Sequence, residues 1–261
     1  REVSEVTLGD LSLPVGDLEP ATDYAYRFRV FNEAGANWTS AAATFTTRQD
    51  RSGDAPDQQP FRLVVWPDSQ WASEKWPEIL PVMAQWIVDQ RDAMNIKYVL
   101  HVGDMVQSGH IEEEWRGFDA AMRVLDGELP YTLAVGNHDL DRLDETRTVL
   151  FNRTFPPSRF ERMPGFGGSF LEGRSDSTYH TFRAIGRDWL ILTLMYNPDQ
   201  DVLAWANEVV EEHPDHLVIV NTHSYLTHTG RDRSGQVIWD ALVKQHPNMF
   251  VVVCGHLSTV H

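Results

Sequence analysis

Short apolar segments that end in polar clusters recur along most of the chain. FRLVVW leads to PDSQ, KYVLHV to GDMV, YTLAV to GNHD, HLVIV to NTHS, and MFVVVC to GHLS. Apolar runs of this length, bounded by polar clusters, are typical of buried strands. From Asp68 to Asp104 is 36 residues and from His223 to His256 is 33, close to the roughly 30 residues of a strand-helix-strand unit. The pattern predicts parallel strands, whose carboxyl ends meet at the sheet edge where α/β proteins bind ligands.

Helices are predicted between these strands. Residues 76–94 place apolar side chains on one helical stripe, namely Ile79, Leu80, Met83, Trp86 and Ile87. Residues 111–125 and 200–212 form two further predicted helices. Residues 155–180 are Gly-rich and read as an insertion loop, long enough to reach the sheet edge and shape substrate choice through Phe160, Phe166 and Tyr179.

The first 47 residues show a different period. Tyr24, Tyr26, Phe28 and Val30 alternate with smaller or charged residues, which predicts a half-buried strand. The segment LEPATDYAYRFRVFNEAG resembles the second half of a fibronectin type III domain, whose conserved corner would be occupied by Leu18, Pro20, Thr22 and Tyr24. Since that sandwich needs about seven strands, we expect residues 1–47 to be part of such a domain. Residues 48–60 contain no large apolar residue and suit a linker.

Composition narrows the class of partner. The 261 residues include 22 Lys and Arg against 38 Asp and Glu, a formal net charge of −16. Such a field repels nucleic acid and anionic membranes unless a bound cation reverses it locally. No apolar run approaches the roughly 18 residues of a transmembrane helix. Cys254 is the single cysteine, so the chain has no internal disulfide.

The polar clusters carry candidate metal ligands. At the predicted sheet edge we expect to find Asp68, Asp104, Asn137, His138, His223 and His256. Hard oxygens mixed with imidazoles suit Mn, Fe or Zn better than Ca or Mg alone. Two carboxylates at one edge would repel each other without a cation between them, so we expect Asp104 to bridge two ions. One Gly-Asp pair after a strand is usually only a turn, and it is the series of five clusters that indicates a site.

Residues 61–261 resemble a calcineurin-like metallophosphoesterase domain, whose motifs are DxH, GDxx, GNH with an acid, a later His, and GHxH. The resemblance implies a four-layer α/β/β/α fold, with two mixed sheets packed face to face and helices outside. It assigns Asp68 to a first divalent metal and Asp104 to a bridging position. Asn137, His223 and His256 would bind the second metal. His138 would protonate the leaving oxygen, and Asp139 would orient it.

Two positions depart from the family motifs. Gln70 stands where the first motif has His, and Ser258 stands where GHxH has its second His. Gln70 still offers an amide oxygen, a harder and weaker ligand than imidazole, so we expect the first site to bind its ion weakly or to favour Mn or Mg. His261 lies three residues beyond Ser258 and is a substitute ligand or simply a flexible end. Because the chain ends right after this motif, further core strands are expected beyond it.

The motifs of this chain differ from those of one subgroup of the family and are similar to those of another. Purple acid phosphatases have a tyrosine three residues after the bridging Asp, where this chain has Gln107. The runs GSFLEGRSDSTYHTF and VIVNTHSYL are instead similar to a bacterial secreted subgroup in which the first motif reads Asp-x-Gln.

These features predict a metal-dependent hydrolase of phosphomonoesters or phosphodiesters, extracellular or periplasmic by the fibronectin resemblance. For such an enzyme, we expect the first domain to act as a spacer for the catalytic domain or to contact a cell surface or glycan. One alternative is a non-catalytic module with a degenerate first metal site that binds metal and phosphate. Another is a protein whose biological role is adhesion through the sandwich.

Overall fold

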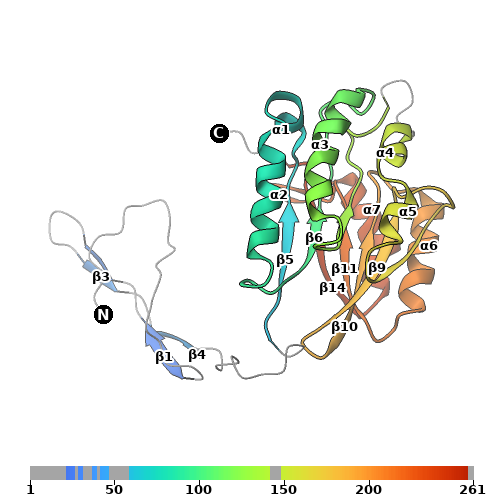
Figure 1. The fold of residues 1–261 in the computed structure, drawn as a ribbon. Coiled ribbons are helices and arrows are strands. Elements are labelled where there is room, and N and C mark those ends of the chain that lie inside the picture. The colour runs from blue at the N-terminus through green and yellow to red at the C-terminus, as the bar shows by residue number, and fades with distance from the viewer. Residues whose placement is uncertain are drawn as a thin grey trace. The chain divides into compact units, whose positions relative to one another are not determined.

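The chain forms two compact units, residues 1–55 and 56–261. The structure, a computed structural model, describes residues 22–26, 29–31, 37–39, 42–46, 59–141 and 148–257 (Figure 1). In the first unit, β1 (Asp23–Tyr26) pairs antiparallel with β4 (Ala43–Thr46), and β2 (Arg29–Phe31) pairs antiparallel with β3 (Asn37–Thr39). Leu18 and Pro20 lie outside the described residues, so the fibronectin resemblance stays a prediction.

The second unit contains two larger sheets. The first has the order β5 (Arg62–Trp66), β6 (Ile96–His101), β7 (Tyr131–Leu133), with all its strands parallel. The second has the order β14 (Met249–Val253), β11 (Leu217–Asn221), β10 (Arg187–Thr193), β9 (Thr178–Ala184), β8 (Phe166–Ser169). Here β14, β11 and β10 are parallel to one another. β9 pairs antiparallel with β10, and β8 pairs antiparallel with β9. A short hairpin of β12 (Leu226–Thr227) and β13 (Gly230–Arg231) follows β11.

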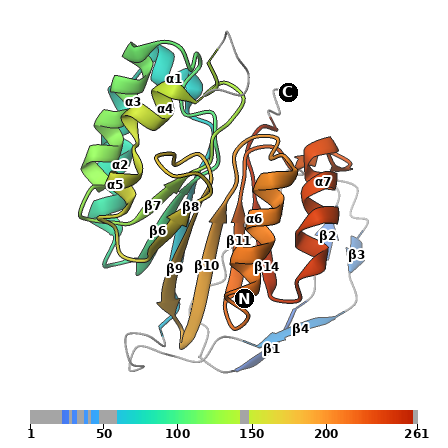
Figure 2. The same cartoon turned by 90° about the vertical axis from the view of Figure 1, so that its right-hand side faces the viewer.

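Helices cover the outer face of each sheet (Figure 2). The three-stranded sheet is covered by α1 (Gln70–Lys75), α2 (Ile79–Gln90), α3 (Glu112–Leu125), α4 (Val149–Thr154) and α5 (Pro157–Phe160). The five-stranded sheet is covered by α6 (Gln200–Glu211) and α7 (Arg233–Ala241), with a 3-10 turn at Val243–Gln245.

Alternation along the central strands fixes this layering. In β10, Leu190 and Leu192 pack into the core beneath α6 and α7, whereas Trp189 and Ile191 pack into the core between the sheets. In β6, Val99 belongs to the core beneath α1 to α5. Successive strand residues point to opposite faces, so a strand buried on both sides must be apolar throughout. Three separate cores therefore hold four layers together in the order helix, sheet, sheet, helix.

The predicted strands and helices are present in the structure. The five apolar runs form β5, β6, β7, β11 and β14, and the three helices predicted at 76–94, 111–125 and 200–212 contain α2, α3 and α6. The expectation of two mixed sheets is wrong for one of them, because the described strands of the first sheet are all parallel. Among the described residues, no helix is long and apolar enough to cross a membrane.

The reading of residues 155–180 as a loop is wrong. This segment contains α5, β8 and the start of β9, and Phe160 is only 1% exposed within the core beneath the helices. Its ring lies 5.9 Å from Tyr131 and 6.3 Å from Phe166, centroid to centroid. Burial of these rings stabilises the segment as part of the domain. Two of the glycines in this segment, Gly167 and Gly168, belong to β8, and Gly167 lets the chain pass close to the Tyr179 ring.

The apolar stripe of α2 is also only partly buried. Leu80 and Ile87 enter the core, while Ile79, Met83 and Trp86 are 43%, 41% and 53% exposed. The helix was predicted correctly, but its buried face is narrower than the apolar pattern implied.

Candidate metal centre

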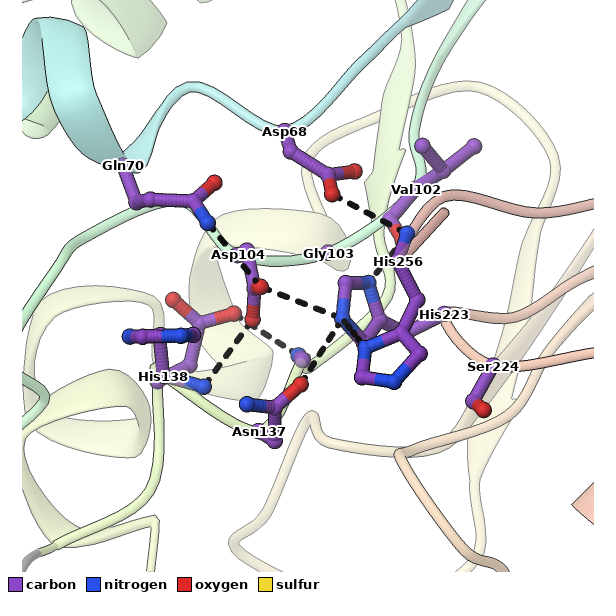
Figure 3. A network of polar contacts seen from close by, with 12 residues as sticks. Asp68, Gln70, Val102, Gly103, Asp104, Asn137, His138, His223, Ser224 and His256 are labelled. Atoms are coloured by element: carbon purple, nitrogen blue, oxygen red, sulfur yellow. Dashed lines mark hydrogen bonds and ion pairs between the residues drawn. The ribbon is translucent and has the colours of Figure 1, made fainter. Parts of the chain in front are cut away.

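The polar clusters that follow five strands meet at one end of the two sheets (Figure 3). Asp68 follows β5, Asp104 follows β6, Asn137 and His138 follow β7, His223 follows β11 and His256 follows β14. All of these residues, together with Gln70 at the start of α1, belong to one polar network, which His138 joins through its backbone amide. The structure therefore brings together the residues that the sequence singled out.

Asp104 lies at the centre of this network. Its Oδ2 is 3.2 Å from His223 Nε2 and 3.3 Å from Gln70 Nε2, while its Oδ1 accepts a hydrogen bond from the backbone amide of His138 at 2.9 Å. The residue is 2% exposed and has a positive φ of 51°. Positive φ is uncommon outside glycine, and such backbone strain tends to persist at functional sites.

Imidazoles converge on one side of Asp104. His223 Nε2 lies 3.1 Å from Asn137 Oδ1 and 3.0 Å from His256 Nδ1. One ligand atom from each of Asp104, His223 and His256 can be chosen so that all lie within 4.8 Å of one another. The other nitrogen of His223, Nδ1, is 2.9 Å from the Val102 carbonyl. Because that carbonyl accepts from Nδ1–H, Nε2 keeps a lone pair for a cation.

Two oxygens of the network are unpaired. Asp68 Oδ1 and Gln70 Oε1 are buried and have no hydrogen-bond partner among the described residues. Asp68 Oδ2 accepts from the backbone amide of His256 at 3.0 Å. Buried polar atoms are nearly always paired, so each of these oxygens needs an explanation. A cation is a partner that carboxylate and amide oxygens both bind.

Glycines in the motifs allow the ligands to approach the backbone closely. A Cβ on Gly136 would lie 2.2 Å from Asp104 Oδ1, and a Cβ on Gly255 would lie 2.1 Å from Asp68 Oδ1. Neither space admits a side chain. The glycines of GNHD and GHLS are therefore required by the packing of ligands that belong to other motifs.

Charges within the site shift its pKa values. Burial alone would raise the pKa of Asp104, but the hydrogen bond and charge of His223 outweigh burial and hold that pKa below its usual range. Burial likewise opposes protonation of His223, yet Asp104 raises the pKa of the imidazole. For Asp68 burial dominates, and the neighbouring Asp104 charge adds to it, so the pKa of the Asp68 carboxyl is raised. A cation between the two carboxylates would relieve this repulsion.

His138 is oriented by a backbone carbonyl. Its Nδ1 lies 3.0 Å from the carbonyl oxygen of Gln107. An oxygen with no hydrogen of its own must accept, so Nδ1 carries the proton and Nε2 is the atom left to exchange one. This geometry suits a group that transfers protons from Nε2.

Asp139 has different contacts from those expected. Its Oδ1 accepts from the backbone amides of Met105 and Val106 at 2.8 and 3.1 Å, and its Oδ2 accepts from the amide of Gly136 at 2.8 Å. Burial, reinforced by the charge of Asp104, raises the pKa of this carboxyl to about 8. The orienting contact to the His138 ring comes from Gln107 instead. Asp139 holds the GDMV and GNHD loops together, which is a correction to its expected role.

Two residues near the site were not found from the sequence. Tyr196 has its ring 6.0 Å from that of His223 and 5.8 Å from that of His256, and its amide donates to the Val135 carbonyl at 2.8 Å. It follows β10, so a polar residue after a further apolar strand was the available signal. Glu114, within α3, accepts from the backbone amides of Gln107 and Ser108, and its sequence pattern gave no such signal. Ser258 and His261 lie outside the described residues, and their roles stay predictions.

Comparison with known proteins places this site in a family. The family model described as calcineurin-like phosphoesterase matches residues 61–258, which include every described residue of the network. The chain belongs to the calcineurin-like phosphoesterase family. Its members are metallophosphoesterases, hydrolases that use divalent metal ions, and the donor set at Asp104 fits that chemistry.

One curated relative matches most of the chain. The chain is 34% identical over 211 residues to the uncharacterized protein YvnB of Bacillus subtilis (strain 168), a match that covers 80% of this chain and 16% of that protein. The chain thus spans about a sixth of the length of this relative.

Solved structures share the fold. A purple acid phosphatase from yellow lupin (Lupinus luteus) seeds has a TM-score of 0.53 and 16% identity, covering 92% of this chain and 44% of the phosphatase. A dimetal phosphatase from Danio rerio has a TM-score of 0.50 and 14% identity, covering 75% of this chain and 81% of the other. At such identities the likeness concerns the fold.

Proposed function

We propose that this calcineurin-like phosphoesterase hydrolyses phosphomonoesters or phosphodiesters at a two-metal centre bridged by Asp104. Asp68 and Gln70 would hold the first cation, and Asn137, His223 and His256 the second. The observation that carries the proposal is the position of Asp104, whose Oδ2 lies 3.2 Å from His223 Nε2 and 3.3 Å from the Gln70 amide nitrogen, in a network that also contains the unpaired Oδ1 of Asp68. Such a carboxylate is suited to bridging two ions.

The residues around the centre supply the remaining chemistry. Two bound cations would lower the pKa of a water molecule and withdraw charge from the phosphate oxygens. His138 is held by Gln107 with Nδ1 protonated, and a proton on its Nε2 can pass to the leaving oxygen. The backbone amide of His138 keeps Asp104 in place, and the Val102 carbonyl does the same for His223.

The first cation is expected to bind more weakly than the second. Its described side-chain ligands besides the bridging Asp104 are one carboxylate and one amide, and an amide oxygen is a weaker ligand than imidazole. All-oxygen donors favour Mn or Mg, whereas the imidazoles of the second site also suit Fe or Zn. Membership of the Asp-x-Gln subgroup would make Gln70 a normal feature of the site.

Hydrolysis by metal-reconstituted protein tests the proposal. Protein stripped of metal and then loaded with Mn, Zn, Fe or Mg should release nitrophenol from p-nitrophenyl phosphate or from bis(p-nitrophenyl) phosphate. Two bound ions, or one tight ion with turnover that rises as Mn is added, would support it. One tight ion with no turnover under any metal would contradict it and support a non-catalytic module that binds metal and phosphate.

For the first unit we propose the role of a spacer or of a contact to a cell surface or glycan, at an extracellular or periplasmic location. The proposal rests on the fibronectin resemblance of residues 1–47. Removal of these residues should abolish binding to cells or immobilised glycans and leave hydrolysis unchanged. Unchanged binding after the deletion would refute the contact role.

A further inference from the structure

The loop that orients His138 is itself held by a buried carboxylate. Glu114 Oε2 accepts from the backbone amides of Gln107 at 2.7 Å and Ser108 at 3.0 Å. The side chain belongs to the first turn of α3 and is 8% exposed. An ionised acceptor forms roughly twofold stronger hydrogen bonds with amides than a neutral one does. Glu114 therefore fixes the peptide units that precede and follow Gln107.

The same loop contacts His138 at two points. The Gln107 carbonyl accepts from the imidazole Nδ1 at 3.0 Å, and the Gly109 amide donates to the His138 carbonyl at 2.8 Å. Trp115, the residue after Glu114, donates from Nε1 to the Gly109 carbonyl at 2.8 Å. The first turn of α3 thus holds the loop at both ends of its contact with His138.

We propose that Glu114 is a positioning residue for proton transfer by His138. Its carboxylate fixes the Gln107 peptide, the Gln107 carbonyl fixes Nδ1–H, and the ring is thereby held with Nε2 toward the leaving oxygen. This inference rests on the proposed function, because it assigns Glu114 a part in the same reaction. Glu114 would act through the loop, because its Oε2 accepts from the Gln107 and Ser108 amides.

The identity of the leaving group separates this role from a purely structural one. An alkoxide leaves poorly and needs a proton, whereas p-nitrophenolate leaves readily without one. Loss of His138 alignment should therefore slow hydrolysis of an alkyl phosphate far more than hydrolysis of p-nitrophenyl phosphate. A general loss of folding or of metal would slow both reactions equally.

The experiment compares Glu114→Ala, Glu114→Gln and the wild type on ethyl phosphate and p-nitrophenyl phosphate, or on the matching diesters. For Glu114→Ala we expect kcat on the ethyl ester to fall about 100-fold, the cost of a misplaced catalytic group, with KM and metal content unchanged. On the nitrophenyl ester kcat should stay within about twofold. Glu114→Gln keeps an acceptor oxygen and should restore part of the loss.

Controls make each outcome informative. Glu113→Gln changes an exposed carboxylate in the same helical turn and should match the wild type on both esters. Three results would overturn the inference: equal losses on the two esters, no loss on the ethyl ester, or loss of bound metal. If Glu114→Ala does not fold, the same criteria apply to Glu114→Gln. A wild type that hydrolyses neither ester would instead refute the proposed function.

Discussion

Each oxygen of the Asp104 carboxylate has a different task. Oδ2 faces both His223 and Gln70, while Oδ1 receives the amide of His138. A single residue therefore connects the two proposed cation sites to the proposed acid. Since its neighbours are either ligands or proton donors, substitutions around it should separate metal binding from proton transfer.

His138→Ala should abolish proton transfer and spare the metals. His138 contributes only its backbone amide to the Asp104 carboxylate, and alanine keeps that amide. We expect kcat on an alkyl phosphate to fall by about 10²- to 10⁴-fold, the usual contribution of a general acid, with metal content equal to that of the wild type. Metal analysis beside steady-state kinetics checks this, and loss of an ion in the variant would show that His138 is a ligand instead.

Gln70→Ala should weaken the first cation alone. The variant removes the Gln70 amide, whose Oε1 is unpaired and whose Nε2 donates to Asp104 Oδ2. The Mn concentration for half-maximal activity should rise about tenfold, the lower end of what a supporting group costs a metal site. A metal titration followed by activity measures this, with Gln85→Ala on the exposed face of α2 as control. An unchanged Mn requirement would exclude Gln70 from the site.

At the scale of elements, the sequence predicted the strands that carry the site and missed how its loops are held. The strands β6 and β11 are buried on both faces, so their sequences are apolar throughout. Each strand, and the polar residue that follows it, could therefore be predicted from the sequence. The contacts of Gln107, Glu114 and Tyr196 depend on loop backbone geometry. Periodicity carries no information on which carbonyl or amide a loop turns toward the site, so these contacts required the structure.

Phe160→Ala tests the correction to residues 155–180. Phe160 is 1% exposed against Tyr131, Phe166 and His180. Loss of a buried phenyl ring should lower the free energy of unfolding by about 3 to 5 kcal/mol and leave KM unchanged. Urea unfolding and kinetics check the two parts. Leu171→Ala, an exposed position in the same segment, should change neither quantity. A changed KM with unchanged stability would restore the substrate-loop reading.

At the scale of the whole molecule, stability depends on the apolar cores that separate the layers. His180 of β9 is buried among them, with Nδ1 2.6 Å from the Tyr98 hydroxyl and its ring near Phe160 and Phe166. Burial lowers the pKa of this imidazole to about 3. A neutral histidine inside the core makes the second unit sensitive to acid.

The direction of this sensitivity follows from proton uptake. Between the folded pKa of about 3 and the unfolded value of 6.5, the unfolded chain binds a proton at His180 that the folded chain does not. The stability that His180 contributes is therefore full above about pH 6.5 and is lost as the pH falls, by about 2 kcal/mol between pH 7 and pH 5.

Urea unfolding at pH 7 and pH 5 measures this loss. His180→Gln keeps a polar group for Tyr98 but does not titrate, so its pH dependence should be smaller than that of the wild type by that amount. His228→Gln, at an exposed position, should retain the wild-type dependence. Equal pH dependence in the wild type and His180→Gln would show that His180 is not held neutral in the core.

The central claim is that Asp104 bridges two cations. Anomalous diffraction at the manganese edge, from crystals of the protein loaded with Mn, tests it most directly. The account predicts two peaks about 3.5 to 4 Å apart, one beside Asp68 and Gln70 and the other beside His223 and His256, with the Asp104 carboxylate between them. A single peak at saturating Mn, or peaks that do not flank Asp104, would contradict it.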